Sequence, residues 1–252
     1  MSEIKTFYPF LLMKLFKIAG DISLILSKLV LFKKMKKLKT VSGLSLKWQW
    51  LLLLSYIFQF IDIREWKEIT FYNCYWNLVK VALLEYQIGI ILLILFKFNE
   101  TYSKKADKVN MGLIISISML LGWIFTVGKK QNIMLIKYFG LNVSKNYYKW
   151  DLLKNIGVIL DTLSIFPQLI MIQETEDCEI INAKSIFFFG MSKVFYLIYS
   201  IIKFKSITYV ILGIINLLFC GNFMWNYYKY ILHNIELQLR TVSYNTFINI
   251  CY

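Results

Sequence analysis

Proline, histidine and cysteine are all scarce in this chain. Two prolines in 252 residues agree with long helices and leave little room for a linker between domains. The four cysteines form no CxxC pair and the one histidine is His233, which excludes a zinc site and a disulfide framework. No Cys/His/Asp catalytic set can be assembled from these residues. We therefore expect no enzyme activity, no bound metal and no cofactor.

A cleavable signal peptide is also missing, because Lys14 and Lys17 interrupt the first apolar run and no small-residue cleavage site follows it. We expect the first membrane helix itself to direct insertion. Hydrophobic residues make up 58% of the chain, whereas a soluble domain has roughly 45–50%. They come in blocks of about 18–22 residues, the length that crosses a bilayer. The composition predicts a multi-pass membrane protein with one compact bundle.

The net charge of +14 does not indicate a nucleic-acid partner, because the lysines lie between and at the ends of the apolar blocks. In those places lysines orient helices and meet anionic membrane lipid. The first strongly basic stretch, KKMKKLK at 33–39, predicts a cytoplasmic loop and a lumenal N-terminus. The longest loop, 128–150, is then lumenal although it carries five lysines. Of two glycosylation triplets, this topology exposes Asn142 to modification and not Asn99.

Seven apolar segments predict seven transmembrane helices. We expect a short N-terminal extension at 1–13, a transmembrane domain at 14–228 and a cytoplasmic tail at 229–252. The segments lie at about 14–32, 46–63, 76–96, 109–127, 151–172, 185–203 and 207–228. The fourth carries no ionisable group, and the turns after the first and the fifth each precede two further segments. The expected fold is an all-α membrane protein with two parallel three-helix repeats plus a linking helix, as in SWEET and PQ-loop proteins.

Ionisable residues inside these segments are candidate site residues, because a membrane helix rarely carries them without a function. Asp161 and Lys193 lie in the fifth and sixth segments, where they either form a site or neutralise each other as structural glue. Lys17 and Asp21 are four residues apart in the first segment, so they either pair at the helix end or face a cavity. In the third segment we expect Glu85 to face the bundle interior.

Five stretches carry a resemblance to a known family: FKIAGDIS (16–23), SGLSLKWQ (42–49), VKVALLEYQIGIILLILFKFNETY (79–102), LDTLSIFPQLIMI (160–172) and FFFGMSKVFYLIYSIIKF (187–204). Together they resemble the ER lumen protein-retaining receptors, the KDEL receptors. The resemblance implies a SWEET-like arrangement of seven helices around a lumen-facing polar cavity. It also implies capture of a C-terminal Lys-Asp-Glu-Leu-type tetrapeptide in the Golgi and its release in the endoplasmic reticulum. The implied partners are ER-resident lumenal proteins and vesicle coat proteins.

The resemblance also implies the ligand-binding residues, position by position. Lys17 and Lys203 stand where the family has arginines, and lysine keeps the charge but not the bidentate fork. Asp151 and Asp161 replace family glutamates, and Lys193 replaces the arginine that faces the second of them. The predicted ligand-binding set is Lys17, Gln59, Asp62, Asp151, Asp161, Lys193, Tyr196 and Lys203.

Some replacements change the chemistry that the resemblance implies. Gln59 replaces the arginine that receives the peptide's terminal carboxylate, and Phe60 replaces the tyrosine beside it. Leu24 replaces the histidine whose protonation couples binding to pH. Two alternatives to a retention-signal receptor stay open: a SWEET/PQ-loop-type small-solute transporter, indicated by Pro167-Gln168 and the repeat, and a relative that has lost ligand binding.

Overall fold

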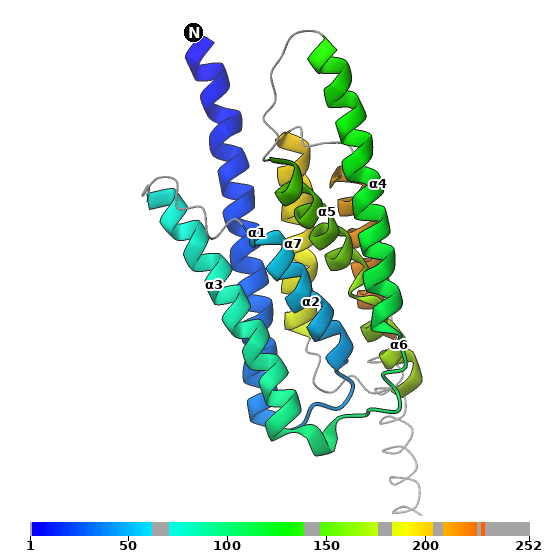
Figure 1. The fold of residues 1–252 in the computed structure, drawn as a ribbon. Helices are drawn as coiled ribbons and strands as arrows, with labels where there is room; N and C mark the ends of the chain where they lie inside the picture. The colour runs from blue at the N-terminus through cyan, green and yellow to red at the C-terminus, as the bar shows by residue number, and fades with distance from the viewer. Residues whose placement is uncertain are drawn as a thin grey trace, which may run out of the picture.

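The computed structural model describes residues 2–61, 71–138, 147–175, 183–203, 209–225 and 228–229, and all regular structure in these ranges is helical. The labelled helices are α1 (Ser2–Leu38), α2 (Leu46–Gln59), α3 (Phe71–Leu92), α4 (Met111–Tyr138), α5 (Tyr147–Leu163), α6 (Phe166–Thr175) and α7 (Ala183–Ile202) (Figure 1). A π-helical turn at Leu93–Lys97 and a 3₁₀ turn at Asn99–Thr101 follow α3. A further helix, Tyr209–Trp225, follows α7. The predicted all-α class is confirmed.

Three helical stretches are long and apolar enough to cross a membrane: Cys74–Lys97, Trp150–Ile172 and Lys184–Ile202. Two shorter apolar helices span Met111–Val127 and Tyr209–Trp225. Large apolar side chains also stand on the outside of the bundle, many of them on α4, where Trp123 is 60% exposed. Such a surface suits contact with lipid chains and not with water. The chain is a multi-pass membrane protein.

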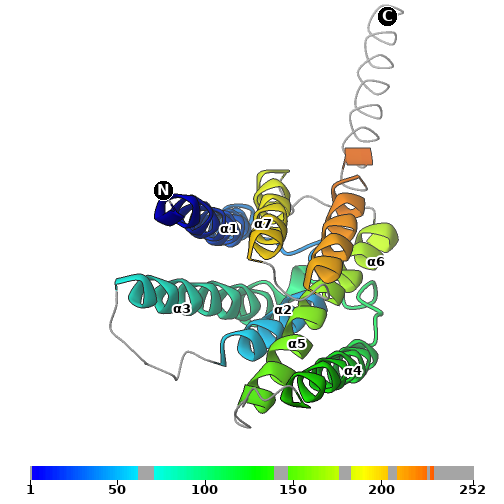
Figure 2. The same cartoon turned by 90° about the horizontal axis from the view of Figure 1, so that it is seen from above.

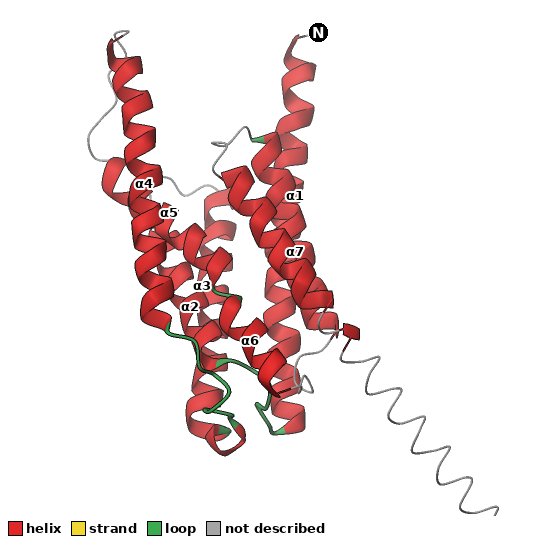
Figure 3. Cartoon of the chain, turned by 90° about the vertical axis from the view of Figure 1, so that its right-hand side faces the viewer, coloured by secondary structure: helices red, strands yellow, loops and turns green. Residues whose placement is uncertain are grey.

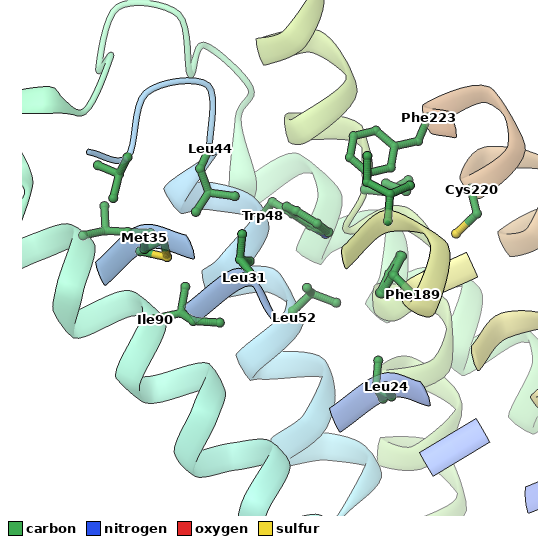
Figure 4. Packing of buried hydrophobic residues seen from close by; sticks show 14 of the residues in the cluster. Leu24, Leu31, Met35, Leu44, Trp48, Leu52, Ile90, Phe189, Cys220 and Phe223 are labelled. Atoms are coloured by element: carbon green, nitrogen blue, oxygen red, sulfur yellow. The ribbon is translucent and has the colours of Figure 1, made fainter. Parts of the chain in front are cut away.

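The helices run side by side and form one bundle (Figures 1 and 2). α1 packs along α7 and also contacts α3. α2 lies between α3 and α5, and α4 covers the outer side of α5. Trp48 of α2 is central to the core, with its ring edge-to-face against Phe189 of α7 at 5.9 Å and against Phe223 at 6.0 Å (Figure 4).

Two expected boundaries differ from the structure. The prediction of a loop at 128–150 is wrong for residues 128–138, because α4 continues to Tyr138. The division expected at residue 13 falls inside α1, and most of the KKMKKLK stretch is the helical end of α1. The physical reason is the same in both places. A lysine marks the end of the part of a helix that can lie in the hydrocarbon region of the membrane. It does not end the helix itself, because lysine is a good helix former.

The fifth apolar segment, expected as one helix at 151–172, is broken into α5 and α6 at Ser164–Ile165. Pro167 lies in the first turn of α6, where its missing N–H and fixed φ are tolerated, whereas a continuous helix would need that N–H. The Ser164 hydroxyl donates to the backbone carbonyl of Asp161 at 2.8 Å. The break therefore sits one turn beyond a predicted site residue.

Hydrogen bonds close the end of the bundle at which α1 finishes, where the loops after α1 and α3 meet (Figure 3). The buried Asp107 carboxylate accepts from the Ser45 hydroxyl at 2.9 Å and from the Tyr102 hydroxyl at 2.6 Å. Burial and this contact raise the pKa of Tyr102, which keeps the phenol protonated as a donor. The Gln168 side chain donates to the Gly43 carbonyl at 2.7 Å and accepts from the Ser45 amide at 2.8 Å.

Candidate functional site

A cavity of about 700 Å³ opens in the half of the bundle away from this closed end. Its walls come from α1, α2, α3, α5, α7 and the helix Tyr209–Trp225. The volume lies within the usual range for small-ligand sites, roughly 300–1,000 Å³. The charged lining residues are Lys17, Lys80, Lys154, Lys193, Lys203, Asp21 and Asp161. Five lysines against two aspartates give the cavity a net positive charge, which favours an anionic ligand.

The structure brings six of the eight predicted ligand-binding residues into this cavity: Lys17, Gln59, Asp161, Lys193, Tyr196 and Lys203. Asp151, near the start of α5, is half-buried and is not among the lining residues. Asp62 lies outside the described residues. Six of the predicted residues therefore lie in the cavity wall, whereas the ligand-binding role of all eight residues stays a prediction.

An ion pair forms the inner wall of the cavity. Lys193 of α7 donates to the Asp161 Oδ2 of α5 at 2.7 Å, and their side chains are 6% and 15% exposed. Asn216, on the last described apolar helix, donates to the same oxygen at 3.1 Å. Together with Asn216, the pair therefore joins three helices, and it also lines the cavity. Asp161 and Lys193 can thus stabilise the bundle and belong to a site at the same time.

A second polar contact involves α7 one turn further along. The Tyr196 hydroxyl of α7 donates to Asp21 Oδ1 of α1 at 2.6 Å, and Asp21 is 2% exposed. The other carboxylate oxygen has no hydrogen-bond partner among the described residues. Gly20 permits this approach, because a Cβ there would lie 2.9 Å from the Tyr196 ring. Asp21 thus faces the cavity while it also interacts electrostatically with Lys17.

Aromatic rings hold the lysines at the cavity mouth. The Lys17 ammonium lies over the Trp76 ring, 2.7 Å from its centroid, and 5.5 Å from the Tyr199 centroid. The Lys203 ammonium lies 5.6 Å from the same Tyr199 centroid and donates to its hydroxyl at 3.2 Å. Such cation–π contacts stabilise a lysine without neutralising it. The aromatic contacts therefore do not by themselves cancel the positive charge of either lysine.

Gln59 is tied to the seam between α2 and α5. Its amide nitrogen donates to the Ser55 hydroxyl at 2.8 Å and to the Gly157 carbonyl at 3.2 Å. Gln59 is neutral, so it cannot replace the charge of the arginine that the resemblance places there. Lys154, one turn before Gly157 on α5, lines the same cavity and supplies a cation close to this seam.

Glu85 is exposed on the outer face of α3, so its expected inward orientation is wrong. The helical period directs Leu83, Gln87 and Ile90 inward and leaves position 85 on the opposite face. The buried Gln87 amide donates to the backbone and side-chain oxygens of Gln49, both at 2.8 Å. At this level of the bundle α3 therefore places an amide, and not a carboxylate, inside, and the Gln87 side-chain oxygen has no hydrogen-bond partner among the described residues.

The structure is thus an all-helical, multi-pass membrane bundle with a net cationic cavity in one half. The family model of the ER lumen protein retaining receptors matches residues 40–203, which is more than half of the chain. The chain belongs to this family, which is a family of receptors and not of enzymes.

Similar proteins match the chain over 85–90% of its length. The chain is 26% identical over 234 residues to ER lumen protein-retaining receptor 3 of Xenopus tropicalis. The matched region covers 90% of this chain and 98% of that receptor. It is 24% identical over 220 residues to ER lumen protein-retaining receptor erd-2.2 of Caenorhabditis elegans, covering 85% and 93%. It is 24% identical over 234 residues to ER lumen protein-retaining receptor 2 of Homo sapiens, covering 90% and 99%. The predicted family is confirmed, and the chain is a distant member.

Proposed function

We propose that this protein binds C-terminal retention signals of the Lys-Asp-Glu-Leu type and retrieves lumenal proteins from the Golgi to the endoplasmic reticulum. The observation that carries the proposal is the net cationic cavity of about 700 Å³ in a member of this family. A tetrapeptide with acidic side chains and a free carboxylate has the opposite charge. It needs several cations presented from different helices, and the cavity presents lysines from α1, α3, α5 and α7.

In this proposal the fold is a seven-span SWEET-like bundle. α1, α2 and α3 form one three-helix repeat. The broken α5–α6 helix, α7 and Tyr209–Trp225 form the other, and α4 links the two. Two observations support this division: α4 packs mainly against α5, and α1 of one group packs along α7 of the other.

The proposal has the cavity face the lumen of the endoplasmic reticulum and the Golgi. Its support is the charge distribution, since the lysines of 33–39 and 97–108 lie at the closed end, opposite the cavity. Short lysine-rich segments stay in the cytoplasm. The vesicle coat proteins expected as partners would then meet the closed end, and the peptide would meet the open one.

Within the cavity, Lys17 and Lys203 hold ligand carboxylates. Lys154 takes over the cationic role near Gln59, while Lys193 is already engaged by Asp161 and orients the inner wall. Tyr196 positions Asp21 through the hydrogen bond between them. Asp62 and Asp151 keep their predicted ligand-binding roles.

Binding of a C-terminal tetrapeptide library to the purified protein, at about pH 5.5 and about pH 7, tests the proposal. Each peptide is compared with its C-terminal amide, which has the same side chains but no terminal charge. We expect free-carboxylate peptides with acidic side chains to bind best. Lys203→Gln should weaken binding by roughly 10- to 100-fold, the usual loss for one charge-assisted contact.

Lys37→Gln is the matched control, because Lys37 is exposed at the closed end of the bundle. Equal binding of free and amidated peptides by the wild-type protein would overturn the proposal. Uptake of a neutral solute by proteoliposomes would instead identify a transporter, although such a cargo gives no reason for five lysines in the cavity.

A further inference from the structure

Exposed lysines gather at the closed end of the bundle, opposite the large cavity. The stretches 33–39 and 97–108 carry nine lysines and two acidic residues, Glu100 and Asp107. The Asp107 carboxylate is buried and accepts hydrogen bonds from within the protein, so Glu100 is the one acidic side chain that these described stretches expose. The exposed lysines, which we call the lysine surface, are Lys33, Lys36, Lys37, Lys39, Lys97, Lys104, Lys105 and Lys108.

Three members of the lysine surface form a stripe along the end of α1. Lys33, Lys36 and Lys37 are spaced three and four residues apart, so they project from the same face of the helix. Met35 lies on the other face and is fully buried. Among the described residues, no carboxylate forms an ion pair with any of the three lysines. Like charges at this spacing repel each other, and the described part of the chain supplies no partner that relieves the repulsion.

Hydrogen bonds hold the two lysine-rich stretches together. The backbone amide of Val41, just after α1, donates to the Thr101 hydroxyl at 3.0 Å. The backbone amide of Lys47, at the start of α2, donates to the Asp107 carboxylate at 3.1 Å. The segment 97–108 is thereby tied to the loop between α1 and α2 (Figure 3). The lysines of both stretches therefore belong to one end of the folded bundle and not to separate tails.

The lysine surface begins where the chain leaves the membrane. The apolar stretch Cys74–Lys97 is long enough to cross a bilayer and ends at a member of the surface. Phe96, directly before it, is 80% exposed, the largest fraction among the exposed large apolar side chains of the described residues. Such a ring suits lipid chains, and the lysines beside it then lie at the level of the headgroups. Clusters of about four to eight lysines next to a membrane helix are typical of binding to anionic lipid.

We propose that the lysine surface binds the headgroup of a phosphoinositide in the membrane leaflet at the closed end. Phosphates on an inositol ring carry several negative charges close together, which matches the stripe on α1, whereas phosphatidylserine carries a single net negative charge. A lipid is favoured over a soluble acidic protein because the surface begins at the membrane, beside an exposed apolar ring. No member of the lysine surface lines the large cavity, so the lipid site is separate from the proposed peptide site.

Thermal unfolding of the purified protein in an uncharged detergent tests this site. Short-chain phosphatidylinositol phosphate, phosphatidylserine and phosphatidylcholine are titrated separately at constant ionic strength. We expect a saturable rise of the unfolding temperature with the phosphoinositide, at lower concentrations than with phosphatidylserine, and no rise with phosphatidylcholine. The triple variant Lys33→Gln, Lys36→Gln, Lys37→Gln should weaken the apparent phosphoinositide affinity on the order of 100-fold, since each lysine near anionic lipid contributes a factor of about five.

The triple variant Lys33→Arg, Lys36→Arg, Lys37→Arg is the matched control, because it keeps the three charges and should keep the response. Phe96→Ser should weaken binding of the lipid but not of water-soluble inositol phosphate, which has no acyl chains. Equal responses to phosphoinositide and phosphatidylserine overturn the site, as does a response that survives in the triple glutamine variant. Inositol phosphate that binds as tightly as the lipid would identify a soluble ligand and overturn the lipid assignment. Peptide binding is measured separately, so its failure would leave this result unaffected.

Discussion

At the scale of single residues, two ion pairs in this protein have the same length and very different surroundings. Lys193 and Asp161 lie 2.7 Å apart with side chains 6% and 15% exposed. Lys108 and Glu174 also lie 2.7 Å apart, but with side chains 62% and 43% exposed. Distance alone would give the two pairs equal importance. Water screens the second pair, whereas removal of one partner of the first leaves a buried charge unpaired.

Asp161→Asn should therefore lower the free energy of unfolding by about 3–5 kcal/mol, because the Lys193 ammonium loses its countercharge in the core. Glu174→Gln should cost less than about 1 kcal/mol. Unfolding in mixed detergent micelles measures both. The double variant Asp161→Asn with Lys193→Met should recover a large part of the loss. Equal effects of the two single substitutions would show that burial does not decide the value of these pairs.

The replacement of a single residue also governs the pH response expected of the peptide cavity. Leu24 lines the cavity and is 4% exposed, and the described lining residues include no histidine. Leu24→His should introduce a side chain that gains a proton between neutral and mildly acidic pH. The added positive charge should raise peptide affinity about tenfold at about pH 5.5 relative to about pH 7.

Leu24→Asn is the control for this change, since asparagine is polar but does not titrate. Peptide affinity measured at both pH values in the two variants separates proton uptake from simple polarity. A pH response that is the same in the two would refute a role for the introduced imidazole.

At the scale of helices, glycines set the distance between neighbouring elements. A Cβ at Gly157 of α5 would lie 2.9 Å from the Gln59 Cγ and 3.0 Å from the Ser55 carbonyl oxygen of α2. The close approach allows the Ser55 hydroxyl to donate to the Gly157 carbonyl at 2.9 Å. Gly221, on the helix Tyr209–Trp225, has nothing within 4 Å of the same position. One glycine is required by a neighbouring helix, and the other is not.

Gly157→Ala should push α5 away from α2 and cost about 1–3 kcal/mol through overpacking. It should also weaken peptide binding, because Gln59 and Lys154 lie along this seam. Gly221→Ala should be neutral or should stabilise by up to about 1 kcal/mol, since alanine is the better helix former. Unfolding and peptide affinity of the two variants provide the comparison. A loss of equal size at Gly221 would contradict the packing explanation.

Elements were predictable from the sequence where a block of apolar residues gave the signal, as in the stretch that becomes α7. Helix ends were not predictable, because the end of an apolar block marks where the helix leaves the lipid and not where its backbone hydrogen bonds stop. α4 is an example, since it continues to Tyr138. In the site, charges inside apolar segments indicated Lys17, Asp161 and Lys193. Trp76 gave no such signal, because aromatic residues are common near the ends of membrane helices.

Tyr56 and Lys28 were missed for related reasons. A tyrosine in an apolar helix gives no sign that it lines a cavity, as Tyr56 does. Lys28, which is 2% exposed, lies five residues before the lysine run at 33–39, so it looks like part of a basic helix end. Only the tertiary packing of α1 against α2 and α7 shows that it is enclosed.

At the scale of the whole molecule, the bundle is open in one half and closed at the opposite end. The cavity is lined by the middle of α1 and the C-terminal half of α7. The Asp107 and Gln168 hydrogen bonds join the loops at the other end, where the lysines of 33–39 and 97–108 also lie. The orientation of the molecule in the membrane therefore decides which compartment the cavity can sample.

Glycosylation of the chain in microsomal membranes reports this orientation. Asn99 begins the 3₁₀ turn Asn99–Thr101 at the closed end and is exposed, so accessibility does not prevent its modification. Asn142 lies outside the described residues, between the ends of α4 and α5 that stand at the open end (Figure 1). The positive-inside rule puts the closed end in the cytoplasm. We expect Asn142 to be modified and Asn99 not.

Asn142→Gln should then remove the glycosylated species and Asn99→Gln should leave it unchanged. The reverse pattern would place the lysine-rich end in the lumen and the cavity on the cytoplasmic side. A cytoplasmic cavity could not meet the C-termini of lumenal proteins, whatever its affinity for acidic peptides in solution. The glycosylation pattern and the peptide-binding assay are thus independent conditions for the same function, and retrieval of lumenal proteins requires both.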